Sequence, residues 1–224
     1  MIIKAISAVL WKLRRRRFMR EQSGKLKNRD FTIFSSNCIG GMLYHDLGLV
    51  FSSPFINLFL SCEDFIRFCE SYETYLQQEL LPAEEQGAYP IAKLGELTIH
   101  LVHYKSFAQA KAAWERRCKR INPNNLFLIT TDRDGFTPEL SERFDALPYR
   151  KVLLVHQPDN NPNHFYIKGY EDKEQVGDLI KKADPRNGKR IMDQYDWISF
   201  LNQNDMNIQK SEHTNVKAGA ENVY

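Results

Sequence analysis

The sequence predicts an α/β fold: a mostly parallel sheet covered by helices on both faces, in a Rossmann-like three-layer arrangement. Short runs of apolar and β-branched residues, typical of buried strands, occur at 31–34, 97–104, 126–131 and 151–156. Segments with the apolar spacing of amphipathic helices lie between and after these runs. Such alternation of strands and helices favours parallel strands joined by helical crossovers.

Composition and length indicate one globular domain with extensions at both ends. The 224 residues, 42% of them hydrophobic, are enough for a single sizeable core and a tail. We expect a basic amphipathic helix at 1–30, one α/β domain at 31–202 and a disordered polar tail at 203–224. The four cysteines have no CxxC spacing, which indicates reduced thiols in a cytoplasmic protein.

The charge of the chain is concentrated at its N-terminus. Residues 1–30 contain ten Lys or Arg against two acids, a charge of +8, so the rest of the chain carries −5 of the total +3. A mildly acidic body gives little support to general nucleic-acid binding. We therefore expect no nucleic-acid partner.

Apolar side chains of the N-terminal helix are expected on one face, followed directly by the run Arg14–Arg17. The face comprises Ile2, Ile6, Val9, Leu10 and Leu13. The apolar run is shorter than the roughly 20 residues of a membrane span, and it lacks a signal-peptide cleavage site. One interpretation places residues 1–20 on anionic inner-leaflet lipid of the cytoplasmic membrane, with Trp11 and Phe18 near the interface. The alternative is a helix packed on its own domain with a solvated basic edge.

The remaining elements follow from local patterns. A stripe of aromatic residues predicts a helix at 62–81, after an irregular segment at 47–54. Ser106 is the expected N-cap of a helix at 107–121, and Pro138 the first residue of a helix ending near 147. Two further helices are expected at 171–183 and 189–202.

Several blocks of sequence, in order, resemble one bacterial family. They are SSNCIGGMLYHDLGLVFSSPFINLFL, YPIAKLGELTIHLVHYKSF, WERRCKRIN and TDRDGF, and the match runs from about residue 31 to about residue 200. The chain resembles the domain of unknown function 1919, whose members are often labelled exopolysaccharide biosynthesis proteins. The resemblance implies an association with surface-glycan assembly, and it implies no established catalytic residue.

Asp132, Arg133 and Asp134 directly follow a predicted buried strand. Two carboxylates at this spacing could share a divalent cation, Mg²⁺ or Mn²⁺, with the phosphates of a nucleotide-sugar donor. Sugar-nucleotide transferases commonly use Asp-x-Asp in this setting, and Arg133 could bind phosphate. The alternative is ordinary turn chemistry, in which Asp134 and Gly135 supply a bend.

A second candidate site follows the first predicted strand. Ser36, Asn37, Gly40 and Gly41 could form a loop whose backbone amides receive a phosphate or carboxylate. Cys38 could be a nucleophile if a helix N-terminus stabilised its thiolate. The alternative for Cys38 is a small packed residue.

Two histidines complete the candidate site. His103 and His156 are expected at the carboxyl ends of strands, as are Asn37 and Asp132. Because the carboxyl ends of parallel strands share one edge of a sheet, all four should meet in one cleft. Either histidine could act as a general base there; the alternative is a structural role.

These observations favour a cytoplasmic, peripheral membrane protein that transfers an activated, phosphate-bearing sugar during surface-polysaccharide biosynthesis. A nucleotide sugar or a phosphorylated glycan would be the donor. One alternative is a non-catalytic, membrane-associated component of a polysaccharide assembly complex. Another is a cysteine-dependent hydrolase.

Overall fold

The computed structural model describes residues 2–84, 87–184 and 186–203, with side chains from residue 8 onward. Except for Gln203, the expected C-terminal tail lies outside the described residues. The side chains of Ile2 and Ile6 lie outside them too.

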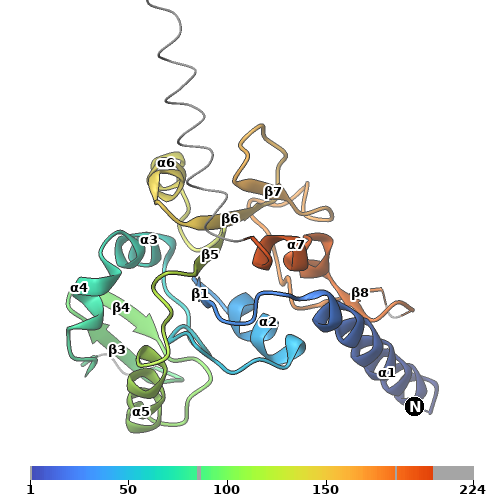
Figure 1. Cartoon of the computed structure of the whole chain (residues 1–224), viewed down its shortest axis with the longest axis horizontal. Helices are drawn as coiled ribbons and strands as arrows, with labels where there is room; N and C mark the ends of the chain where they lie inside the picture. The colour runs from blue at the N-terminus through green and yellow to red at the C-terminus, as the bar shows by residue number, and fades with distance from the viewer. Residues whose placement is uncertain (1, 85–86, 185, 204–224) are drawn as a thin grey trace, which may run out of the picture.

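A four-stranded sheet forms the centre of the protein (Figure 1), and all its strand pairs are parallel. In spatial order the strands are β1 (Thr32–Ser35), β5 (Leu126–Thr131), β6 (Arg150–Val155) and β7 (His164–Tyr166). The predicted strands at 31–34, 126–131 and 151–156 are therefore confirmed. Their apolar runs are long enough to be buried on both faces, as the centre of a covered sheet requires.

Helices cover both faces of this sheet, so the predicted three-layer α/β class is confirmed. The helices are α1 (Ile2–Lys25), α2 (Ile39–Leu47), α3 (Cys62–Glu70), α4 (Tyr72–Leu76), α5 (Phe107–Cys118), α6 (Pro138–Ala146), the 3-10 helix η1 (Ile191–Gln194) and α7 (Trp197–Leu201). One core joins Phe34, Leu128 and Leu153 to α3–α6. The other joins Ile33, Ile129 and Leu154 to α1, α2 and α7. Neighbouring strand residues point to opposite faces, so each strand contributes to both cores.

A small antiparallel sheet corrects one strand prediction. It contains β2 (Leu81–Pro82), β3 (Ile91–Leu94) and β4 (Leu97–His100). The strand expected at 97–104 therefore ends at His100 and does not join the parallel sheet. The reason is the tight β3–β4 connection, in which Gly95 adopts a φ of 59°, as two-residue hairpin turns require.

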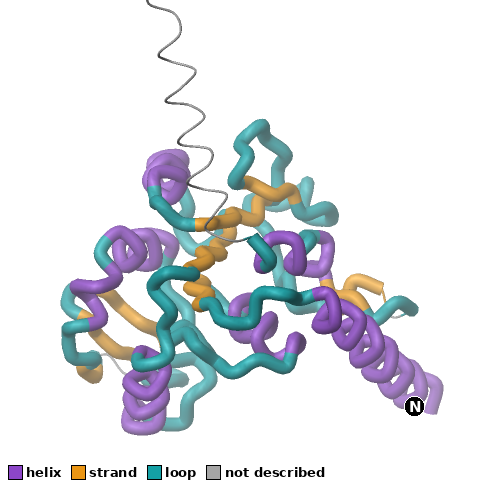
Figure 2. Tube along the Cα trace, in the orientation of Figure 1, coloured by secondary structure: helices purple, strands orange, loops and turns teal. Residues whose placement is uncertain are grey.

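Three helix predictions also need correction. The helix expected at 62–81 breaks at Ser71 and ends at Leu76. Residues 171–181 contain no helix and run as a loop (Figure 2) into β8 (Lys182–Asp184), which pairs with β9 (Lys189–Arg190). The segment expected as a helix at 189–202 divides into β9, η1 and α7. In the loop the Val176 N–H donates to the Asp132 carboxylate, a bond that replaces a helical one.

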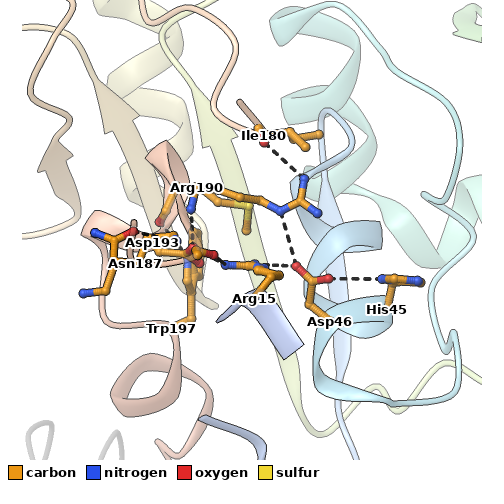
Figure 3. A network of polar contacts seen from close by, with 11 residues as sticks. Arg15, His45, Asp46, Ile180, Asn187, Arg190, Asp193 and Trp197 are labelled. Atoms are coloured by element: carbon orange, nitrogen blue, oxygen red, sulfur yellow. Dashed lines mark hydrogen bonds and ion pairs between the residues drawn. The ribbon is translucent and has the colours of Figure 1, made fainter. Parts of the chain in front are cut away.

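Helix α1 forms as predicted, but it buries a different face from the one expected. Trp11 and Met19 are buried, Phe18 is half-buried, and the expected apolar residues Val9 and Leu13 are 57% and 53% exposed. Between Trp11 and Met19, the buried Arg15 forms ion pairs with Asp46 of α2 and Asp193 of η1 (Figure 3). These partners orient the helix, because a buried guanidinium requires compensating charge. No helix among the described residues has the length and apolarity of a transmembrane segment.

Contacts between α2 and the edge strand β1 position the start of α2. The Ile33 N–H donates to the Tyr44 hydroxyl at 2.9 Å, and that hydroxyl donates to the Phe31 carbonyl at 3.2 Å. Tyr44 thereby occupies backbone groups that an edge strand would otherwise expose. The N-terminus of α2 lies, as a result, at the carboxyl end of β1.

Candidate functional site

A cavity of about 270 Å³ lies at the carboxyl ends of β1 and β5. Segments far apart in the chain line it. They are Asn37, Cys38 and Ile39 at the start of α2; Thr131, Arg133 and Asp134 after β5; Phe59 and Val102; and the loop residues 177–180. This is the edge at which open α/β sheets commonly bind ligands.

Most of the predicted site residues meet at this edge. Asn37, Asp132 and His156 follow three adjacent parallel strands, and Asn37 Nδ2 donates to Thr131 Oγ1 at 3.4 Å. His103 arrives by a different route, from the loop after β4, with its Nε2 3.6 Å from Cys38 Sγ. Of these four residues only Asn37 is among those that line the cavity, so the prediction that all four meet in one cleft is not confirmed. His103 also does not follow a parallel strand.

Asp132 and His156 form a hydrogen-bonded pair beside the cavity. Asp132 Oδ2 lies 2.5 Å from His156 Nδ1 and accepts the His156 backbone N–H at 2.7 Å, while Oδ1 accepts the Val176 N–H at 2.8 Å. A carboxylate facing Nδ1 holds the proton there and leaves Nε2 as a proton acceptor. Neither side chain lines the cavity, but Asp132 is the residue between Thr131 and Arg133, which do. This is the geometry of an oriented general base.

Arg133 brings a half-buried positive charge to the cavity wall. Its Nη1 donates to the Gly177 carbonyl at 3.2 Å. Its Nε is buried and has no hydrogen-bond acceptor among the described residues. A buried donor without an acceptor is costly, and a guanidinium matches the geometry of phosphate and carboxylate oxygens. The cavity is therefore lined by a guanidinium of the kind that suits an anionic group.

The predicted glycine loop has a different local structure from the one expected. Gly40 lies in the first turn of α2, where an added Cβ would be 3.0 Å from Ser35 Cβ and 3.1 Å from Ile33 Cγ2. Gly41 faces Ile56, and neither glycine is among the residues that line the cavity. Ser36 is buried and its Oγ accepts from Thr130 Oγ1 at 3.0 Å. Gly40 therefore allows α2 to pack closely on β1, whereas Gly41 contacts Ile56 and Ser36 bonds to β5. The three residues do not form an open phosphate loop.

The N-terminus of α2 still reaches the cavity through Asn37 and Cys38. Asn37 Oδ1 accepts the Ile39 N–H at 3.1 Å, and Cys38 is an N-cap residue that makes no side-chain capping bond. Burial raises the pKa of the Cys38 thiol, and the charge of Asp178 raises it further. A thiolate is therefore disfavoured, which weakens the case for a cysteine-dependent hydrolase.

Asp132 and Asp134, the carboxylates expected to bind a cation, differ in how many hydrogen bonds they already accept. Both oxygens of Asp132 already accept hydrogen bonds, whereas Asp134 lies exposed in a turn with a φ of 58°. Across the described ranges, no group of three or more His, Cys, Asp or Glu side chains is arranged to hold a metal ion. Asp132 would have to give up a hydrogen bond to coordinate Mg²⁺ or Mn²⁺, so this pair fits a resident cation poorly.

Sequence reasoning missed the far wall of the cavity. The loop residues 177–180 include Asp178, a second acid at the site, and Gly177, whose carbonyl holds Arg133. Their apolar spacing resembles a helix, and no local signal marks the loop as part of a site. Phe59 and Val102 were missed because their place depends on how the small sheet packs.

Comparison with known proteins assigns the chain to a family. The family model described as domain of unknown function (DUF1919) matches residues 9–202. A Haemophilus influenzae (strain ATCC 51907 / DSM 11121 / KW20 / Rd) protein described as uncharacterized is 40% identical over 193 residues. That alignment spans 84% of this chain and 93% of the relative. The chain therefore belongs to the DUF1919 family.

Proposed function

We propose that this protein is a glycosyltransferase of surface-polysaccharide biosynthesis that binds a phosphate-bearing sugar donor in the cavity at the carboxyl ends of β1 and β5. The observation that carries the proposal is Arg133, an arginine that lines the cavity and whose buried Nε has no acceptor among the described residues. The cavity volume of about 270 Å³ is near the lower limit for ligand pockets and suits a sugar phosphate better than a large cofactor. The link to polysaccharide rests on the resemblance of the sequence to proteins labelled exopolysaccharide biosynthesis.

Each group at the site then has a role in transfer. Arg133, with the start of α2, binds the donor phosphate. His156, held by Asp132, removes the proton from an acceptor hydroxyl. The acceptor oxygen bonds to the anomeric carbon as the bond to the phosphate oxygen breaks, and the phosphate leaves with the electron pair. Arg133 stabilises the charge that develops on that leaving group. His103, beside Cys38, is the alternative base.

A divalent cation enters this proposal only with the donor. Asp134 is the carboxylate with oxygens available, and the phosphates of a nucleotide diphosphate would supply further ligands. Donor binding should consequently be measured with and without Mg²⁺ or Mn²⁺.

A second candidate is a non-catalytic component of a polysaccharide assembly complex at the inner face of the cytoplasmic membrane. The specific observation in its favour is the exposed apolar side of α1, where Val9 and Leu13 point away from the protein core. Under this proposal Asp132→Asn, assayed at a temperature where the variant stays folded, leaves function intact, whereas deletion of residues 1–20 abolishes it. The transferase proposal expects Asp132→Asn to impair turnover.

Isothermal titration of the full chain with nucleotide sugars and sugar 1-phosphates tests the donor site. We expect one donor class to bind wild type and to bind Arg133→Met roughly 10- to 100-fold more weakly, as expected for loss of charge-assisted hydrogen bonds. Arg116→Met, an exposed arginine of α5 away from the cavity, is the matched control and should bind as wild type does. Equal affinities of all three proteins, or no donor binding with either cation, would reject the transferase proposal.

A further inference from the structure

A second, larger groove lies between α1 and α2, away from the proposed donor cavity. Its volume is about 810 Å³. Its cationic lining residues are Lys12, Arg15, Arg16, Arg20, Arg29 and Arg190. Asp46 is the single acidic residue among the described residues that line it. The groove is thus strongly positive in a protein whose residues after position 30 carry net negative charge.

The charge of Asp46 is already compensated within the protein. Its Oδ2 pairs with Arg15 Nη2 and lies 3.5 Å from Arg190 Nε, and only 7% of the Asp46 side chain is exposed (Figure 3). Arg15 also pairs with Asp193, outside the groove. Asp46 therefore does not neutralise the outer cations of the groove.

Those outer cations form a row along α1. Lys12, Arg16 and Arg20 are exposed at a spacing of four residues, and none forms an ion pair within the part of the chain that is described. Like charges at this spacing repel and weaken a helix. Gly24 continues the row, and a Cβ added there would have nothing within 4 Å, so this end of the groove is open. A bound anion would relieve the repulsion without a steric barrier.

Two of the residues that line the same groove also carry hydrogen-bond donors without an acceptor. Trp11 Nε1 and Arg15 Nε are both buried and without a hydrogen-bond acceptor among the described residues. The two residues are only 8% and 6% exposed, and both line the groove. Buried donors of this kind normally have a partner, and phosphate oxygens could accept from them.

The exposed face of α1 indicates where such phosphates come from. Val9, Leu13, Arg16 and Arg20 follow the spacing i, i+4, i+7, i+11, which places them along one face of the helix. That face is apolar toward the N-terminal end and cationic beyond it. Helices of this kind lie at membrane surfaces, with the apolar side chains among acyl chains and the cations at the phosphates. Figure 1 shows α1 at the margin of the molecule, where a flat surface could reach it.

We propose that the α1–α2 groove binds the phosphate headgroups of anionic phospholipids, while Val9 and Leu13 insert beside them. This inference deepens the membrane association proposed above, because it names the lipid class and the residues that select it. The lipid proposal does not depend on whether a sugar donor binds in the cavity at the carboxyl ends of β1 and β5.

Vesicle co-sedimentation of the full chain tests this inference. Phosphatidylcholine vesicles with and without phosphatidylglycerol are compared for wild type, Arg16→Gln/Arg20→Gln and the control Arg116→Gln/Lys119→Gln. Both double variants remove two charges, but Arg116 and Lys119 are exposed at α5, outside the groove and away from α1. Each basic residue at an anionic surface contributes a factor of about five, so the groove variant should partition roughly 30-fold less. The control should remain within a factor of about three of wild type, as distant charges are screened.

Two further results distinguish a lipid site from a free-phosphate site and from attraction by net charge. Leu13→Ser should lower partitioning roughly tenfold while keeping the requirement for phosphatidylglycerol. Equal losses in the two double variants would overturn the proposal, since binding would then depend on net charge alone. So would saturable binding of soluble glycerol phosphate with no binding to vesicles, which would indicate a free-phosphate site. Donor titration of Arg16→Gln/Arg20→Gln without vesicles should match wild type, so a failure of the groove is distinguishable from a failure of the donor cavity.

Discussion

The carboxylate of Asp132 accepts hydrogen bonds from two separate parts of the chain, the residue after β6 and the loop after β7. It therefore has a structural role as well as its proposed role of orienting His156. Both carboxylate oxygens of Asp132 face N–H groups. Replacing Asp132 by asparagine keeps the size of the side chain but places its NH₂ group against one of those N–H groups. Substitution of Asp132 should therefore lower the stability of the protein, even though the residue lies at the edge of the sheet.

Asp132→Asn should lower the free energy of unfolding by about 1–3 kcal/mol, the usual cost of leaving a buried donor unpaired. Thermal unfolding followed by circular dichroism should show this as a fall in Tm. Asp134→Asn is the matched control, because asparagine also tolerates the positive φ of that turn, and its effect should be within about 0.5 kcal/mol. Equal stability of the two variants would contradict the structural role of Asp132.

The Cys38 thiol offers a second prediction at this scale. Burial and Asp178 raise its pKa above the ordinary value of a thiol, so the thiolate fraction near neutral pH should be small. Alkylation of Cys38 by iodoacetamide at pH 7.5 should be slower than alkylation of free glutathione, and its rate should still be rising at pH 9.5. Urea-unfolded protein provides the control, with the profile of an ordinary thiol. Rapid alkylation of folded Cys38 at pH 7 would revive the hydrolase alternative.

Local sequence identified the polar residues of the site better than their roles. Asn37, Asp132, Arg133 and His156 were predictable because each follows a strand or lies next to a residue that does. The role of Gly40 was not, since its contact with Ser35 depends on how closely α2 approaches β1. Such an approach is a property of tertiary packing.

At the scale of elements, the close approach of α2 to β1 can be tested by adding one methyl group. Gly40→Ala would place Cβ 3.0 Å from Ser35 Cβ and should destabilise the protein by about 1–3 kcal/mol, the usual cost of overpacking. Gly41→Ala places Cβ 3.6 Å from Ile56 Cγ2, an ordinary contact, and removes a helical glycine. That control should be neutral or stabilising by up to about 1 kcal/mol. Urea unfolding of both variants decides whether Gly40 serves packing, and equal effects would argue against it.

Buried strands were the elements most readily predicted, because continuous apolar runs such as β5 and β6 have few alternatives. The helix expected at 171–183 failed for a definite reason. Val176 and Leu179 are buried with apolar spacing that a helix would also show, but the side chain of Asp132, just after β5, captures the Val176 N–H. A bond between residues 44 positions apart cannot be read from a local pattern.

At the scale of the whole molecule, a buried ion network attaches α1 to the rest of the protein. Arg15 pairs with residues 31 and 178 positions away, Asp46 and Asp193 (Figure 3). The Arg15 side chain is only 7% exposed, so water and salt screen these pairs weakly. The sequence showed a run of four arginines, and only the fold distinguishes the buried one from its exposed neighbours.

Arg15→Met should loosen α1, because it leaves Asp46 and Asp193 with less compensating charge in a buried site. We expect a loss of about 3 kcal/mol in the free energy that protects α1 from opening. Hydrogen exchange of the α1 amides should measure it as faster exchange. Arg17→Met is the control, since the Arg17–Glu21 pair is exposed and should contribute less than about 1 kcal/mol. Unchanged protection of α1 in Arg15→Met would contradict this attachment.

Binding of a phosphate-bearing donor at Arg133 is the central claim, and NMR of the arginine Nε–H groups tests it directly. The Arg133 signal is assigned by its loss in Arg133→Lys, and a sugar-phosphate donor is then titrated into wild type. We predict a saturable downfield shift of the Arg133 Nε–H signal, as expected when an N–H group that lacked an acceptor gains a phosphate oxygen as its acceptor. A donor that binds while the Arg133 signal stays in place would contradict the proposed site.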